Sequence, residues 1–181
     1  MTSIMLSGAQ EAYKFNIEGP FGRGLSLKSE FSGKIAIVCS GTGILPFMDL
    51  FDILLKRQVY LKLIKDGRDG SVVKPEQEYF EILKNAELDL YCSFATPQSF
   101  LGKEWIGKLI ELTNDSGNKK GGLSKCEVRL PAEYAESDSL IGESWPKIFE
   151  TGHRLYDYEF FVLREFTGYD RVYVSGGPTF R

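Results

Sequence analysis

The chain has 181 residues, and 43% of them are hydrophobic, which is enough for one domain with a substantial core. Its 22 basic and 25 acidic residues give a net charge of −3 without long blocks of either sign, which argues against a protein that binds nucleic acid or an anionic membrane. The single histidine argues against a histidine-based metal site. No apolar run is long enough to cross a membrane, and the N-terminal segment lacks a signal-peptide pattern, so we do not expect secretion.

The first 34 residues carry weak patterns. Residues 12–17 and 25–27 are predicted to be short strands, and residues 18–24, with three glycines and a proline, are predicted to be a turn between them. The polar residues 29–34 suit a linker to the remainder of the chain.

The strongest pattern in the chain follows directly. Ile35–Val38 is a run of mostly β-branched apolar residues, typical of a strand that is buried on both faces. Ser40–Gly43 is a tight glycine turn, and a helix is predicted over Ile44–Arg57, with Pro46 in its first turn. The apolar face of this helix consists of Ile44, Phe47, Met48, Phe51, Leu54 and Leu55. A strand, glycine turn and helix present free N–H groups to an anion, but many α/β units use such a turn only to reverse direction. The motif by itself leaves both interpretations open.

Strand and helix patterns alternate over the remainder of the chain. Strands are predicted at 88–94, 126–130 and 171–174, helices at 75–85, 100–112 and 145–166, and polar loops at 65–71, 113–122 and 131–142. Residues 59–64 alternate apolar and polar side chains, which predicts an extended segment. The three cysteines, Cys39, Cys92 and Cys126, are odd in number and widely spaced, which favours buried reduced thiols over disulfides or a metal site.

This alternation favours an α/β fold, a three-layer parallel sheet with helices on both faces. Ligands of such sheets bind at the carboxyl ends of the strands. Three of the predicted strands end in turns rich in glycine or hydroxyl residues, at 41–43, 95–99 and 175–178. The convergence of these turns at one edge indicates a nucleotide-binding site more strongly than any single motif.

Three blocks of the sequence, in this order and spacing, resemble the ferredoxin–NADP reductase superfamily, which includes ferric-chelate reductases, NADPH oxidases and nitrate reductases. They are Gly19-Pro20-Phe21-Gly22, Ser40-Gly41-Thr42-Gly43-Ile44-Leu45-Pro46-Phe47 and Val172-Tyr173-Val174-Ser175-Gly176-Gly177-Pro178. The resemblance covers nearly the whole chain, and Gly-Thr-Gly-Ile-x-Pro is its most specific part. It implies a Rossmann-like NAD(P)-binding domain at 31–181, truncated at its C-terminal helix, after a remnant of a flavin domain at 1–30.

The resemblance also assigns residues to the cofactor. In the family the second block holds the pyrophosphate, a segment like 96–104 meets the adenosine ribose, and the last block lies beside the nicotinamide. The implied dinucleotide-binding residues are Gly41, Thr42, Gly43, Ile44, Pro46, Thr96, Ser99, Lys103, Ser175, Gly176, Gly177 and Pro178. Some NADH-preferring members carry a carboxylate where Ser99 stands. A serine hydroxyl can donate to a 2′-phosphate, so NADPH is slightly favoured over NADH.

The sequence departs from the family pattern in two places. Ser175 and Gly177 stand where the last block usually has the cysteine and the proline of Cys-Gly-Pro. The flavin barrel has no counterpart, so FAD is expected only in a parent protein or partner subunit, in the cytoplasm or on the cytoplasmic face of a membrane. Two functions stay open. One is the NAD(P)H-binding part of a flavin-dependent oxidoreductase without a catalytic side chain of its own, and the other is a degenerate, non-catalytic structural or sensor subunit.

Overall fold

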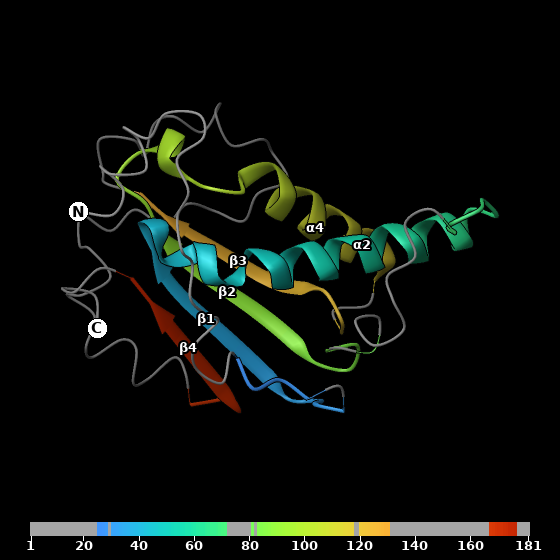
Figure 1. Cartoon of the computed structure of the whole chain (residues 1–181), viewed down its shortest axis with the longest axis horizontal. Coiled ribbons are helices and arrows are strands. Elements are labelled where there is room, and N and C mark those ends of the chain that lie inside the picture. Colours follow the sequence, from blue (N-terminus) through green and yellow to red (C-terminus); the bar gives the residue numbers. More distant parts are fainter. Residues whose placement is uncertain are drawn as a thin grey trace, which may run out of the picture.

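The structure is a computed structural model that describes residues 25–28, 30–71, 81, 83–117, 120–130 and 167–176. In this part of the chain four strands form one sheet in the order β3-β2-β1-β4 (Figure 1), and all three pairings are parallel. The strands are β1 Lys34–Ser40, β2 Glu87–Ser93, β3 Leu123–Arg129 and β4 Arg171–Ser175. The prediction of an α/β fold with a parallel sheet is therefore confirmed.

The strand order changes direction beside β1. From β1 the sheet continues to β2 and β3 on one side, whereas β4 pairs with the opposite side of β1. In an open α/β sheet such a switch point leaves a crevice outside the carboxyl ends of the two diverging strands. Here these are the ends of β1 and β4.

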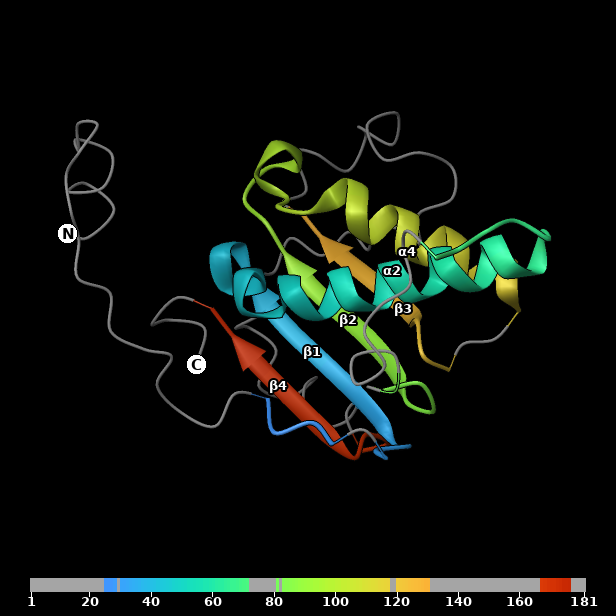
Figure 2. The ribbon, with the colours of Figure 1, turned by 45° about the vertical axis from the view of Figure 1, so that its right-hand side comes forward.

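Two long helices cover one face of the sheet. A 3₁₀ helix, η1 Gly41–Phe47, leads into α2 Met48–Lys65, and a short 3₁₀ helix, η2 Pro97–Ser99, precedes α4 Lys103–Ser116. Figure 2 shows α2 and α4 side by side on the same face of the sheet. The apolar face predicted for the first helix is confirmed, because its side chains lie in or against the main core.

The opposite face of the sheet carries a smaller apolar cluster, formed by Ala36, Val38 and Tyr91 with Tyr169 against them. No helix of the described part of the chain covers this face. The second helical layer was predicted over 145–166, which lies outside the described residues, as do the predicted strand at 12–17 and the block at 19–22. The prediction of helices on both faces is thus tested for one face only.

Several predicted elements differ from the structure. Residues 59–64 are helical, because α2 continues to Lys65, and the alternation there reflects a helix end whose Leu61 and Ile64 are exposed. The predicted loop 113–122 begins with four helical residues, because the buried Thr113 donates from its hydroxyl to the Leu109 carbonyl and Gly117 ends α4 in the left-handed region.

Residues 25–27 form no strand. Their carbonyl groups bond to side chains of β4 instead, from Arg171 to Ser26 and from the Tyr173 hydroxyl to Leu25. The third strand is longer than predicted, because β3 starts at Leu123 rather than at residue 126. Of the predicted helix 75–85, the structure describes Glu81 as helical and residues 83–85 as turn.

Candidate functional site

The carboxyl ends of β1, β2 and β4 lie at one edge of the sheet, as the sequence predicts. Ser40 pairs with Ser93 of β2, and Cys39 pairs with Ser175 of β4. The turns after the three strands therefore begin from adjacent positions. This edge, comprising Ser40–Gly43, Thr96–Ser99 and Ser175–Gly176, is the candidate site. Gly177 and Pro178 lie outside the described residues.

Gly43 brings the first of these turns against β4. A β-carbon at position 43 would lie 2.6 Å from the carbonyl carbon of Ser175 and 2.8 Å from the Cα of Gly176. Real β-carbons do not approach backbone this closely, so no other residue fits here without movement of one of the two segments. Gly43 is therefore needed for the packing of η1 on β4, whether or not a ligand binds.

Gly41 is a glycine for a different reason. Its φ is +54°, in the left-handed region, and a β-carbon there would meet nothing within 4 Å. Space beside the backbone is thus open at the point where the chain leaves β1, and the next residue, Thr42, is exposed. An anion could approach the backbone N–H groups of this turn closely.

The remaining residues of the second block are divided between core and surface. Ile44 is completely buried in the main core, so it can offer a ligand only its backbone. Pro46 is exposed on η1, in the 3₁₀ segment rather than in the first turn of an α-helix. No side chain caps the start of η1, which leaves its first N–H groups without a side-chain acceptor of that kind.

A pair of serine hydroxyls supports this edge and was missed from the sequence. The Ser93 hydroxyl donates to Ser40 Oγ at 3.2 Å, which links the ends of β1 and β2. Ser40 Oγ accepts this bond, so its own hydrogen is available for another acceptor. The signal that could have revealed the pair is a serine at the last position of each of two neighbouring strands.

The turn after β2 is closed on itself. Thr96 Oγ1 accepts from the Ser99 N–H at 3.2 Å, and Ser99 Oγ accepts from the Thr96 N–H at 3.1 Å, a capping box. The Ser99 hydroxyl also donates to the Thr96 carbonyl at 2.7 Å. Its hydrogen is therefore in use within the turn, and donation to a 2′-phosphate would require breaking this bond.

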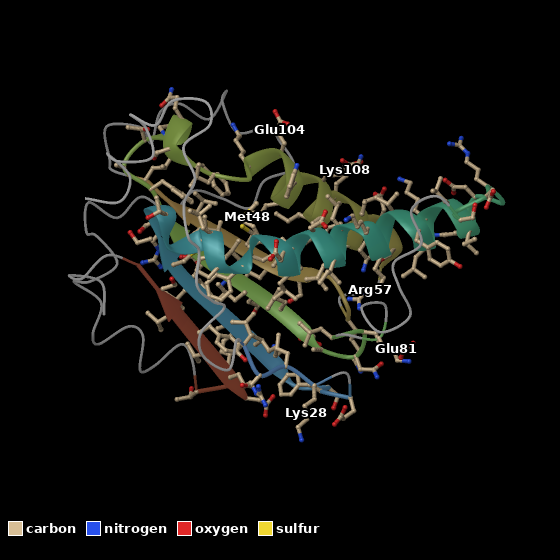
Figure 3. The ribbon with its side chains drawn as sticks, viewed as in Figure 1. Lys28, Met48, Arg57, Glu81, Glu104 and Lys108 are labelled. Carbon is tan, nitrogen blue, oxygen red and sulfur yellow. The ribbon has the colours of Figure 1, made fainter. Side chains whose placement is uncertain are left out.

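Lys103 is the first residue of α4 and is half-buried. Gly102 before it adopts φ +74°, and a β-carbon there would lie 2.6 Å from Met48 Cε, so the start of α4 packs tightly on the start of α2 (Figure 3). This contact explains why the turn after β2 ends in glycine, and it places Lys103 near the same end of the helical layer as η1.

Metal-ligand groups, membrane-spanning helices and thiols were also considered in the part of the chain that the structure describes. Among them no group of three or more histidine, cysteine or acidic side chains could hold a metal ion. None of their helices is long and apolar enough to cross a membrane. All three cysteines are buried and free, as predicted. Burial, and then contact with the thiols of Cys126 and Cys39, raises the pKa of Cys92, so the Cys92 thiol is a poor nucleophile.

Comparison with protein-family models, with curated proteins and with solved structures finds no match for this chain.

Proposed function

We propose that this chain is the NAD(P)H-binding domain of a flavin-dependent oxidoreductase of the ferredoxin–NADP reductase type. In this proposal it binds the dinucleotide across the carboxyl edge of the sheet and presents the nicotinamide to a flavin held by another domain or subunit. The flavin and the nicotinamide supply the redox chemistry, and the protein supplies position. This chemistry requires no acid–base pair from the protein.

The observation that carries the proposal is the position of Gly41. This glycine has a left-handed backbone and open space beside it, and it follows the central strand directly at the switch point between β1 and β4. Crevices at switch points are where open α/β sheets bind nucleotides. The N–H groups at the start of η1, which no side chain caps, suit a pyrophosphate, and the Ser40 hydroxyl can add a further donor.

A second candidate, a non-catalytic structural or sensor subunit, is favoured by two contacts. The packing of Gly43 on Ser175 accounts for this glycine without a ligand, and the capping box accounts for Ser99 without a 2′-phosphate. Because the Ser99 hydroxyl is already bonded, NADPH and NADH should both be tested. The slight preference for NADPH stays a proposal.

Titration of the purified chain with NADPH and NADH, followed by melting temperature and amide chemical shifts, tests the choice. We expect micromolar binding of at least one dinucleotide by the wild type. Gly41→Ala should weaken it at least tenfold, because the new methyl group occupies the open space beside the turn.

Gly117→Ala is the matched control. Gly117 has φ +66°, and a β-carbon there also meets nothing within 4 Å, but it lies at the end of α4. Both alanine variants should lose a similar roughly 1–2 kcal/mol of stability, since both force an L-residue into the left-handed region. Only Gly41→Ala should lose affinity. Absence of binding at millimolar dinucleotide would favour the non-catalytic subunit.

A further inference from the structure

The edge strand β4 has the least cover in the described sheet. Within that sheet it pairs only with β1, and Val172 and Val174 are 40% and 52% exposed. In contrast, every residue of β1 from Ile35 to Cys39 is buried. β4 nevertheless supplies part of the candidate site, because Ser175 and Gly176 meet Gly43 there. The attachment of β4 to β1 therefore decides whether both sides of the candidate site are in place.

A tyrosine just before β4 reaches across β1 to the next strand. The Tyr169 hydroxyl donates to Asp89 Oδ2 on β2 and lies 2.9 Å from the Tyr91 hydroxyl. Since β1 lies between β4 and β2, the side chain crosses a whole strand, and it packs against the cluster of Ala36, Val38 and Tyr91.

Asp89 is a buried carboxylate in this arrangement, only 6% exposed, and it also accepts from the Ser124 hydroxyl. Burial and then the bond to Asp89 raise the pKa of Tyr169, so its hydroxyl keeps its hydrogen and stays a donor at neutral pH. A hydrogen bond to a charged acceptor is among the stronger ones in proteins, and loss of the donor leaves a buried acceptor short of a partner.

The residue after Tyr169 fixes the start of the strand. Asp170 Oδ2 accepts from the Lys34 N–H at 2.7 Å, and the Asp170 N–H donates to the Lys34 carbonyl at 2.9 Å. Hydrogen bonds of Tyr169 thus link the start of β4 to β2, and those of Asp170 link it to β1. At the carboxyl end of β4, Ser175 packs on Gly43, which has no side chain to hold the strand.

We propose that Tyr169 and Asp89 form a latch that holds β4 on β1 and so keeps the carboxyl ends of the two strands together at the candidate site. Tyr169 is a positioning residue in this device and touches no ligand. The link to ligand binding rests on the function proposed above. A ligand bound across the ends of both strands would bind only molecules in which β4 is docked, so its apparent affinity would be lower when fewer molecules have β4 docked. By reciprocity, the ligand should protect β4.

Amide hydrogen exchange of the ligand-free chain tests the latch directly. In Tyr169→Phe we expect the amides of residues 172–175 to exchange at least tenfold faster than in the wild type, with β2 and β3 unchanged. Asp89→Asn keeps a neutral acceptor and should give a smaller effect of the same kind. Ser71→Ala is the control, because it also removes a hydroxyl bonded to an aspartate, Asp69, and should leave β4 unchanged.

Two results would overturn the latch. One is unchanged exchange in β4 of both variants, and the other is a uniform increase over all four strands, which would indicate global destabilisation. The same samples separate the latch from the function. If β4 loosens as expected but neither NADPH nor NADH binds the wild type, the latch stands and the proposed function fails. If a dinucleotide binds and Tyr169→Phe leaves the exchange rates in β4 unchanged, the proposed function stands and the latch fails.

Discussion

Arg57 is a charged side chain in the core, only 2% exposed on α2, and it donates to the carbonyl of Gly121. Burial lowers the pKa of Arg57 to about 10, although the nearby carboxylate of Glu81 opposes this shift (Figure 3). Gln58 donates to the same carbonyl at 3.1 Å. Two neighbouring side chains of one helix therefore hold the loop before β3, and they do so at the end of the sheet opposite the candidate site.

The cysteines give a test at the scale of single residues. Cys39 and Cys92 are paired across β1 and β2, all three thiols are buried, and the pKa of Cys92 is raised by burial. Because the thiolate is the reactive form, we expect none of the three to react with an aromatic disulfide reagent at pH 8 in the native protein. All three should react in 6 M guanidinium chloride, with a control in which the reagent is added to the refolded protein. Rapid labelling of any thiol in the native state would contradict the buried cluster.

The two glycines of the Gly-Thr-Gly turn show why part of the site could not be predicted. The sequence places Gly41 and Gly43 in one phosphate-binding turn with equivalent roles. The structure separates them, because Gly43 packs on backbone 132 residues away in sequence, at Ser175, and Gly41 faces open space. Local patterns identify the turn, but which glycine contacts the protein depends on the position of β4. Ser99 is a similar case. A serine at this position suggested a hydroxyl that donates a hydrogen bond to a phosphate, but in the structure this hydroxyl donates to the Thr96 carbonyl.

At the scale of elements, α2 and α4 are joined by packing and by one ion pair. Lys62 Nζ lies 2.8 Å from Asp115 Oδ2, and both residues line a groove between the C-terminal halves of the two helices. Residues 59–64 were predicted to be extended because their apolar and polar side chains alternate. This segment is rich in leucine and lysine, which have high helix propensity. The helix therefore continues to Lys65 although Leu61 and Ile64 are exposed. The buried residues earlier in α2, such as Phe51 and Leu54, stabilise the helix to which this segment belongs.

The ion pair leads to a pH-dependent expectation. The hydrogen bond and charge of Lys62 hold the pKa of Asp115 below its ordinary value of 3.8. A carboxyl group with a depressed pKa in the folded state stabilises the fold above its unfolded pKa and loses that contribution as the pH falls through the folded pKa. Carboxyl chemical shifts should therefore show Asp115 titrating below 3.8, and Lys62→Met should bring it back towards that value.

Lys56→Met is the control for this titration, because Lys56 pairs with Asp52 one turn along α2 and does not contact Asp115. It should leave the titration of Asp115 unchanged. An Asp115 pKa that is the same with and without Lys62 would mean that the two helices are not joined by this pair in solution.

At the scale of the whole molecule, the parallel sheet followed from the sequence because its strands are apolar runs with helical patterns between them. Ile35–Val38 and Leu88–Phe94 were located to within a residue or two. Such patterns do not predict the order of the strands. They also do not predict the hydrogen bond between Tyr169 and Asp89, which exists only because β4 lies beside β1. Polar partners that cross a strand leave no periodic signal in the sequence.

The proposed division of labour between two domains gives an expectation for the entire chain. The purified 181-residue protein should bind a dinucleotide without oxidising it, because the flavin that accepts the hydride is expected elsewhere. In the presence of ferricyanide and either NADPH or NADH, the absorbance at 340 nm should fall no faster with the protein than without it. A dinucleotide oxidation that scales with the concentration of this chain, free of added flavin, would contradict the proposal.

The pairing of β4 with β1 also has a kinetic consequence. The bond between Lys34 and Asp170 closes a loop of 136 residues, whereas the bond between Ser40 and Ser93 closes one of 53. Closing the longer loop costs only about 0.8 kcal/mol more entropy, but contacts of long sequence separation slow folding far more than they weaken the final state. We expect the strands β1, β2 and β3 to pair first during folding. The candidate site, which needs the ends of both β1 and β4, would then be completed last.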